Sequence, residues 1–257
     1  MIGGLFLKAE DPKFLARWYE DHLGIGFGTN VYFSFKWRDP KKIEAINNTV
    51  FSFFKNDSGY FLPSVSKIMF NIRVENLDSI RLKLKEGKHF VDEKVESYDY
   101  GRFGWTMDTL GNKIELWEAI DGGFEDNNST MELFRKVTGL QGITVFCAEP
   151  SKAIQFYSEI FEMEFDENSY WMKWNSVENK LESNKTKLSF VNFGDDNPAN
   201  SISGFKIGFY VNRLTELLHD LKSSEIKVSH EIVETPEGKF GWALDPYGNK
   251  IEFFERN

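Results

Sequence analysis

Hydrophobic positions alternate at the start of this chain and then follow a helical stripe. Residues 5–9 place apolar side chains at every second position, which predicts a strand with one buried face. Asp11 is a typical helix cap, and Pro12 suits a first helical turn. Residues 14–23 then carry one apolar stripe that stops before Gly24. The opening segment therefore predicts a strand that leads directly into an amphipathic helix.

Strand-rich segments follow the helix. Runs of aromatic and β-branched residues predict strands over residues 31–37 and 49–54, and a short strand near Gly26-Phe27 completes a strand-helix-strand-strand-strand unit. A second unit with the same order begins at residue 68. Its expected elements are a strand over residues 68–74, a helix carrying Leu77, Ile80 and Leu84, and strands around residues 91–95, 103–107 and 114–117.

An internal repeat organises the whole chain. Residues 103–118 recur as residues 240–255, and ten of the sixteen positions are identical. An offset of 138 residues, against 137 for that segment, relates Tyr19 to Tyr157, so chance does not explain the register. Small, polar and acidic residues separate the two copies. The chain is therefore predicted to have two domains and a linker, at residues 1–119, 139–257 and 120–138.

Bulk composition narrows the choice of partners. The net charge of −9 opposes nucleic-acid binding, which needs clustered Lys and Arg. No apolar run is long enough to cross a membrane or to direct export, so we expect no membrane partner. The single cysteine, Cys147, fits a reducing compartment and a buried inert thiol. We therefore expect a cytoplasmic globular protein.

These patterns resemble the vicinal oxygen chelate superfamily, which includes glyoxalase I, bleomycin-resistance proteins and extradiol dioxygenases. The resemblance rests on the helix that begins Asp11-Pro12 and carries Tyr19, and on the closing hairpin Asp-x-x-Gly-Asn-x-Ile-Glu, which occurs in both copies. It implies an α+β fold of tandem glyoxalase/bleomycin-resistance-like domains. Each domain would pair two βαβββ modules into a half-open sheet around a cavity.

Catalytic members of that superfamily hold a divalent metal in the cavity. The resemblance places their ligands on the first, fifth and last strands, as His, Gln or Glu. In this chain the corresponding positions are Gly4, Met69 and Glu115 in the first copy and Gly142, Lys206 and Glu252 in the second. One carboxylate per copy cannot hold a catalytic metal. We therefore expect no cofactor, with a divalent metal as the alternative.

Strand alternation indicates which neighbours would share the cavity face. The ligand-binding candidates are Lys8, Met69, Asn71, Arg73, Glu115 and Trp117 in the first copy, and Thr144, Phe146, Lys206, Tyr210, Glu252 and Phe254 in the second. A carboxylate in an aromatic pocket needs a charge partner or a proton. We hypothesise that Lys206 pairs with Glu252, and that Lys8 or Arg73 pairs with Glu115.

Several residues keep two interpretations. Glu115 and Glu252 are either structural members of the closing hairpins or ligand contacts, and Trp105 and Trp242 are either hairpin packing or cavity floor. The four histidines fall on helices or at element ends, where surface or capping roles are expected. They are His22, His89, His219 and His230.

Three functions remain open at this point. The first is a metal-independent protein that binds a small organic molecule in an aromatic-lined cavity. The second is a lyase or dioxygenase of the same superfamily with non-standard metal ligands, and the third is a non-catalytic scaffold. Two copies in one chain are compatible with either a monomer or a homodimer.

Overall fold

The computed structural model describes residues 2–120, 137–177, 180–181, 183–192 and 204–257. The predicted linker, residues 120–138, lies mostly outside the described residues. We call residues 2–120 the N-terminal half and residues 137–257 the C-terminal half. No helix in these described ranges is both long enough and apolar enough to cross a membrane.

The N-terminal half follows the predicted order of elements with one correction. Residues 24–27 form no strand, because Gly24 ends the helix in a left-handed conformation and Ile25 and Phe27 are buried in the core. The elements are β1 (Ile2–Ala9), α1 (Pro12–Leu23), β2 (Tyr32–Asp39), β3 (Lys42–Lys55), η1 (Gly59–Phe61), β4 (Ile68–Arg73), α2 (Leu77–Glu86), β5 (Val91–Tyr98), β6 (Gly101–Met107) and β7 (Lys113–Ala119).

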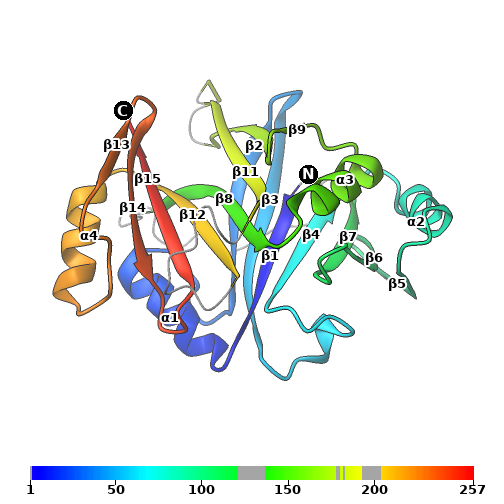
Figure 1. The fold of residues 1–257 in the computed structure, drawn as a ribbon, viewed down its shortest axis with the longest axis horizontal. Helices are drawn as coiled ribbons and strands as arrows, with labels where there is room; N and C mark the ends of the chain where they lie inside the picture. Colours follow the sequence, from blue (N-terminus) through cyan, green and yellow to red (C-terminus); the bar gives the residue numbers. More distant parts are fainter. Residues whose placement is uncertain (1, 121–136, 178–179, 182, 193–203) are drawn as a thin grey trace.

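The C-terminal half repeats this order and has the extra short strand. Its elements are β8 (Val137–Cys147), α3 (Pro150–Phe161), β9 (Phe165–Asp166), β10 (Ser169–Asn175), β11 (Ser183–Asn192), β12 (Phe205–Val211), α4 (Leu214–Ser223), β13 (Val233–Thr235), β14 (Gly238–Leu244) and β15 (Lys250–Arg256). Figure 1 shows both halves with their helices.

Each half forms one curved mixed sheet. In the N-terminal half β1 pairs with β3 in parallel and with β4 in antiparallel orientation, and β7, β6 and β5 follow in order. The C-terminal half uses the same arrangement around β8. One backbone-paired position, Arg38 of β2 with Asn175 of β10, links the strands of the two halves into one continuous 15-stranded sheet. The fold is α+β, as the sequence predicted.

The helix cap predicted at Asp11 explains where the first helix begins. Its Oδ1 accepts hydrogen bonds from the backbone N–H groups of Lys13 and Phe14, both at 3.0 Å. These bonds satisfy two of the donors that the first turn of a helix leaves open. The helix ends at Gly24, whose φ of 68° is a left-handed conformation that glycine adopts readily and that residues with a side chain disfavour.

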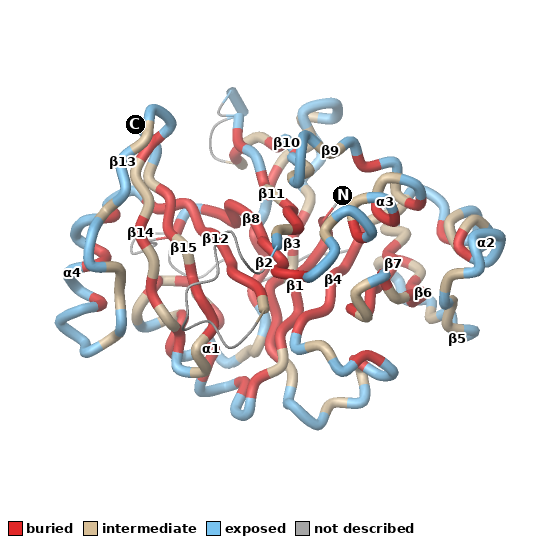
Figure 2. Tube along the Cα trace, viewed as in Figure 1, coloured by how far each residue is buried: buried red, intermediate tan, exposed pale blue. Residues whose placement is uncertain are grey.

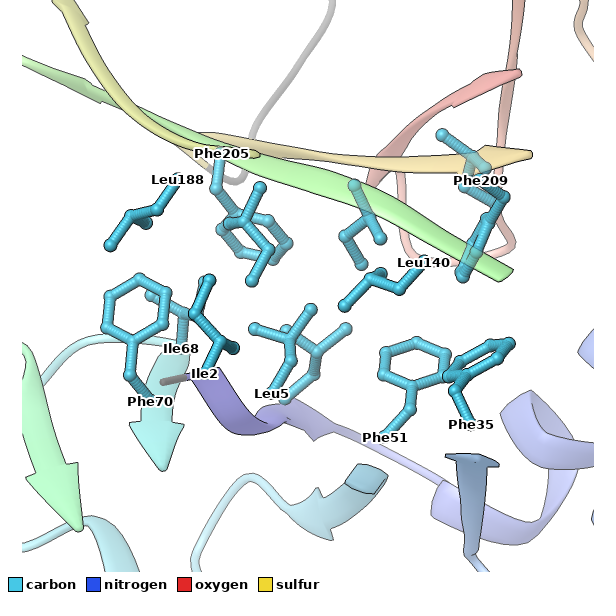
Figure 3. Close-up of a cluster of buried hydrophobic side chains, with 14 of the residues drawn as sticks. Ile2, Leu5, Phe35, Phe51, Ile68, Phe70, Leu140, Leu188, Phe205 and Phe209 are labelled. Atoms are coloured by element: carbon cyan, nitrogen blue, oxygen red, sulfur yellow. The ribbon is translucent and has the colours of Figure 1, made fainter. Parts of the chain in front are cut away.

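The main core lies between the two halves. Buried residues lie along the central strands, while exposed residues lie on the helices and loops around them (Figure 2). Figure 3 shows Leu5 and Phe51 of the N-terminal half facing Leu140 and Phe209 of the C-terminal half. The rings of Phe51 and Phe209 lie 5.9 Å apart. Since each sheet uses one face for this core, its opposite, concave face is left for a site.

Two reciprocal hydrogen bonds join the halves. The Tyr19 hydroxyl donates to Asp245 Oδ2 at 3.3 Å, and the Tyr157 hydroxyl donates to Asp108 Oδ2 at 3.1 Å. Each tyrosine comes from the first helix of one half, and each aspartate opens the closing hairpin turn of the other half. The two sequence motifs that carried the family resemblance therefore meet in the structure and fix the halves together.

Candidate functional site

Backbone register aligns the central residues of the N-terminal concave face. Gly4 of β1 pairs with Asn71 of β4, which pairs with Glu115 of β7, which pairs with Trp105 of β6. The sequence prediction had placed the fifth-strand position at Met69. Met69 instead pairs with Phe6, two residues further along each strand. Asn71 is therefore the residue beside Glu115.

Glu115 is buried and held by neutral donors. The Asn71 amide donates to its Oε1 at 2.6 Å, and the Trp105 indole N–H donates to its Oε2 at 3.2 Å. The Tyr60 hydroxyl also donates to Oε2. Burial raises the pKa of Glu115, while these hydrogen bonds and the nearby charge of Lys113 oppose that rise. The carboxyl group is thus satisfied largely by the protein itself.

Tyr60 reaches this position from η1, a single turn between β3 and β4. Its ring stacks on Phe54 with the centroids 5.2 Å apart and the planes 2° from parallel. Lys113 Nζ donates to the Tyr60 carbonyl at 2.7 Å, which holds the turn over the sheet. Burial and the adjacent Glu115 raise the pKa of Tyr60, so the hydroxyl keeps its proton and remains a donor.

A cavity of about 420 Å³ opens above Glu115. Two ring pairs in its wall are nearly parallel, Tyr98 with Tyr100 and Phe103 with Trp117. Most of the wall is aromatic. The lining residues are Phe6, Tyr32, Val50, Ser52, Phe54, Tyr60, Asn71, Glu96, Tyr98, Tyr100, Phe103, Glu115 and Trp117.

A second hollow, of about 540 Å³, lies elsewhere. It is lined by Trp18 of α1 and by residues such as Tyr247 from the β14–β15 turn, not by the concave face of either sheet. The Tyr247 hydroxyl accepts a hydrogen bond from the backbone N–H of Asp11 at 2.8 Å. This hollow belongs to the seam between the halves.

The predicted candidates of the N-terminal half divide into two groups. Asn71, Glu115 and Trp117 line the cavity, and Met69 packs beneath it. The hypothesis that Lys8 or Arg73 pairs with Glu115 is wrong: within the described ranges the contacts of Glu115 come from other residues.

Strand geometry explains this correction. Lys8 lies four residues from Gly4 on β1, roughly 13 Å along the strand, and its ammonium is 5.0 Å from the Phe61 ring centroid. The Arg73 guanidinium lies 4.4 Å from the Trp117 ring centroid and donates to Asn47 Oδ1 at 2.5 Å. Both cations are thus directed to aromatic rings, away from the carboxylate.

The C-terminal half confirms the other predicted pair. Lys206 Nζ lies 2.9 Å from Glu252 Oε2, with 9% and 20% of the two side chains exposed. Here too the register differs from the sequence count, because Gly208, not Lys206, pairs with both Gly142 and Glu252. The long lysine side chain reaches the carboxylate from a position two residues away on β12, on the same face of the sheet.

The remaining predicted candidates lie on the same concave face. Thr144 Oγ1 is 3.2 Å from Ser189 Oγ, and the Tyr210 hydroxyl donates to the Lys185 carbonyl at 2.6 Å. Phe254 stacks on Phe240 with a centroid distance of 4.5 Å. Phe146 is buried. The two concave faces have therefore diverged: one is an aromatic cavity, and the other is built around an ion pair.

Sequence reasoning missed Tyr60 and Gln141. Tyr60 lies in a segment without periodicity, so no pattern placed it. Gln141 lies where the pairing of β8 with β12 shifts register, and such a shift changes the face to which a side chain points. Its Oε1 lies 2.2 Å from where a Cβ on Gly208 would be. In the N-terminal half the corresponding residues are Gly3 and Asn71, so the amide is on the other strand of the pair. Asn71 Oδ1 lies equally close to the position of a Cβ on Gly3.

The side chains present do not fit the metal of the superfamily. A first-strand ligand at Gly4 would meet the Val50 carbonyl at 3.0 Å, and one at Gly142 would meet the Lys187 carbonyl at 2.6 Å. Glu115 already accepts three hydrogen bonds from protein side chains. In the C-terminal half Gln141 and Glu252 offer oxygen atoms as metal ligands. The Lys206 ammonium is already paired with the Glu252 carboxylate, however, and would repel a cation.

A comparison with models of protein families finds one match, in the C-terminal half. Residues 139–253 match the family model of the Glyoxalase/Bleomycin resistance protein/Dioxygenase superfamily. The C-terminal half of the protein therefore carries a domain of this superfamily, which is also called the vicinal oxygen chelate superfamily. No curated protein sequence matches the chain.

Solved structures share the fold over the whole chain. Homoprotocatechuate 2,3-dioxygenase from Arthrobacter globiformis aligns with a TM-score of 0.61 at 13% identity, covering 99% of this chain and 79% of its own. The 2,3-dioxygenase LapB from Pseudomonas sp. KL28 gives 0.56 at 13% identity, covering 98% and 90%. The Mn(II)-bound glyoxalase from Novosphingobium aromaticivorans gives 0.57 at 12% identity, covering 98% and 80%. At these identities the likeness shows the fold alone.

Proposed function

We propose that the protein binds a small, flat aromatic molecule in the cavity of the N-terminal half, without a metal. The observation that carries this proposal is the cavity of about 420 Å³, whose wall is mainly aromatic and whose floor holds one buried carboxyl group. Such cavities, apolar with a few placed polar groups, are typical ligand sites.

The contacts of Glu115 support binding without a metal. A metal bound through Oε2 of Glu115 would have to displace the Tyr60 hydroxyl and the Trp105 indole N–H, leaving two donors without acceptors in a low-dielectric pocket. Unpaired buried polar groups of this kind cost about 1–3 kcal/mol each. The protein donors therefore compete directly with a cation at this oxygen.

A direct binding titration tests the proposal. 1-Benzothiophene, a flat uncharged bicyclic molecule, is titrated in the presence of EDTA while tryptophan fluorescence and thermal unfolding are followed. We expect saturable binding of one molecule per chain. Trp117→Leu should weaken it about tenfold or more, because a wall of the cavity is lost. Phe254→Leu, at the repeat-equivalent position of the other half, should leave it unchanged. Absence of saturable binding of both 1-benzothiophene and its N–H analogue indole refutes the proposal.

A metal-dependent lyase or dioxygenase is the second candidate. The fold neighbours favour it, since they are named as dioxygenases and a Mn(II)-bound glyoxalase. Within the described residues no three His, Cys, Asp or Glu side chains come together as a metal site. This candidate therefore requires a ligand set outside the usual one, and metal uptake that depends on Glu115 or Glu252 would support it.

A further inference from the structure

The floor of the N-terminal cavity offers hydrogen-bond acceptors that the protein leaves open. An ionised carboxylate has about four lone-pair sites. The three donors on Glu115 use two sites on Oε2 and one on Oε1, which leaves one on Oε1. Beside it, Asn71 Oδ1 is buried and accepts no hydrogen bond from the described residues. A ligand with a donor would satisfy what this floor lacks.

Charge around the cavity disfavours an anionic ligand. Two lining residues are acidic, Glu96 and Glu115, and the lining set contains no Lys, Arg or His. Lys94 pairs with Glu96 but is 64% exposed at the rim. Lys113 lies behind the Trp105 ring, 5.3 Å from its centroid. A carboxylate or phosphate in the cavity would therefore lose its water and face a carboxyl group, while the neighbouring cations Lys113 and Arg73 lie against the Trp105 and Trp117 rings and outside the lining.

The shape of the wall favours a flat ligand. Tyr98 and Tyr100 stack 5.4 Å apart with planes 5° from parallel, and Phe103 and Trp117 stack 5.8 Å apart with planes at 12°. Flat rings gain most from offset stacking or edge contacts with such surfaces. A branched aliphatic molecule of the same volume would gain no comparable contact.

We infer that the cavity selects an uncharged, flat heteroaromatic molecule with an N–H donor on one edge, and that Glu115 and Asn71 are the residues that read this donor. The inference rests on the proposed function and names its ligand class. The edge with the N–H faces the floor, and the ring lies among the stacked side chains of the wall.

Three bicyclic probes of nearly equal shape test the inference by isothermal titration. Indole carries the N–H, 1-benzothiophene lacks it, and indole-3-carboxylate adds a negative charge. We expect indole to bind about 10- to 100-fold more tightly than 1-benzothiophene, the range for a hydrogen bond to a charged group. We expect indole-3-carboxylate to bind more weakly than either uncharged probe.

Glu115→Gln is the matched substitution. Tyr60 and Trp105 both donate to one oxygen of Glu115, so they fix the amide oxygen of the glutamine on their side. Its NH2 group then takes the place of Oε1, and the Asn71 amide has to turn so that its Oδ1 accepts from this group, so that both acceptors for the ligand are lost. The preference for indole should fall to within about twofold, while 1-benzothiophene binding persists and reports an intact cavity. Glu252→Gln, in the other half, should keep the preference.

The outcomes separate the two claims. Equal binding of indole and 1-benzothiophene to the unmodified protein overturns this inference and leaves the proposed function standing. A preference for indole that survives in Glu115→Gln also overturns it. Failure of both uncharged probes to bind overturns the proposed function, and the inference with it.

Discussion

Removing the ammonium of Lys206 should destabilise the protein strongly, because Glu252 would remain partly buried without that partner. The two groups lie 2.9 Å apart, with only 9% and 20% of their side chains exposed. At an effective dielectric constant of about 20 the attraction at this distance is roughly 6 kcal/mol. Desolvation offsets much of it in the intact pair, but deleting one partner exposes the penalty of the other. We expect Lys206→Met to lower the free energy of unfolding by about 2–4 kcal/mol.

Urea unfolding at pH 7, followed by circular dichroism, measures this loss. The double variant Lys206→Met with Glu252→Gln should recover at least half of it, because no charge is then left unpaired. Lys152→Met is the control: its partner Glu149 is 2.7 Å away, but both side chains are about 60% exposed, so the loss should be under about 0.5 kcal/mol. Equal losses for the buried and exposed pairs would refute the reasoning.

Three further predictions concern other parts of the molecule. Tyr19→Phe and Tyr157→Phe should each lower the free energy of unfolding by about 1–2 kcal/mol in urea titrations, because each removes a buried hydrogen bond to an aspartate; no loss for either would contradict the reciprocal contact. Burial raises the pKa of Glu115, so the folded state holds a proton above pH 4.5 that the unfolded state releases. The stability of the unmodified protein relative to Glu115→Gln should therefore fall as the pH rises from 4.5 to 8, and a rising difference would show the opposite shift. Gly142→Ala should lower the unfolding temperature more than Gly4→Ala, since its Cβ would meet a backbone carbonyl at 2.6 Å instead of 3.0 Å; the reverse order would exclude this packing.

Strand alternation was sufficient to find the cavity face. Asn71, Glu115 and Trp117 line the cavity because period-two geometry fixes which side chains share a face of a sheet. The pairing of Lys206 with Glu252 could also be predicted, since a buried carboxylate needs a partner and the nearest cation lies on the neighbouring strand. Local pattern and elementary electrostatics thus gave most of the C-terminal site.

Tertiary contacts decided the rest. Tyr60 reaches Glu115 from a single turn, η1, whose position depends on Lys113 and Phe54 and not on any local period. This hydroxyl and two neutral N–H groups donate hydrogen bonds to the Glu115 carboxylate, where the sequence predicted a cation. Neutral donors of this kind cannot be found by looking only for charged residues. The register shift at Gln141 likewise changes the face of the sheet to which its side chain points, and no local pattern reveals such a shift.

The central claim is that ligand binding in the N-terminal cavity needs no metal, and metal analysis combined with titration tests it most directly. The purified protein is incubated with Mn, Fe, Ni or Zn, dialysed, analysed for bound metal, and titrated with 1-benzothiophene with and without EDTA. We predict no stoichiometric metal and the same affinity in every case. Retention of one metal per chain that Glu115→Gln or Glu252→Gln abolishes, with ligand binding only in the loaded protein, would contradict the account.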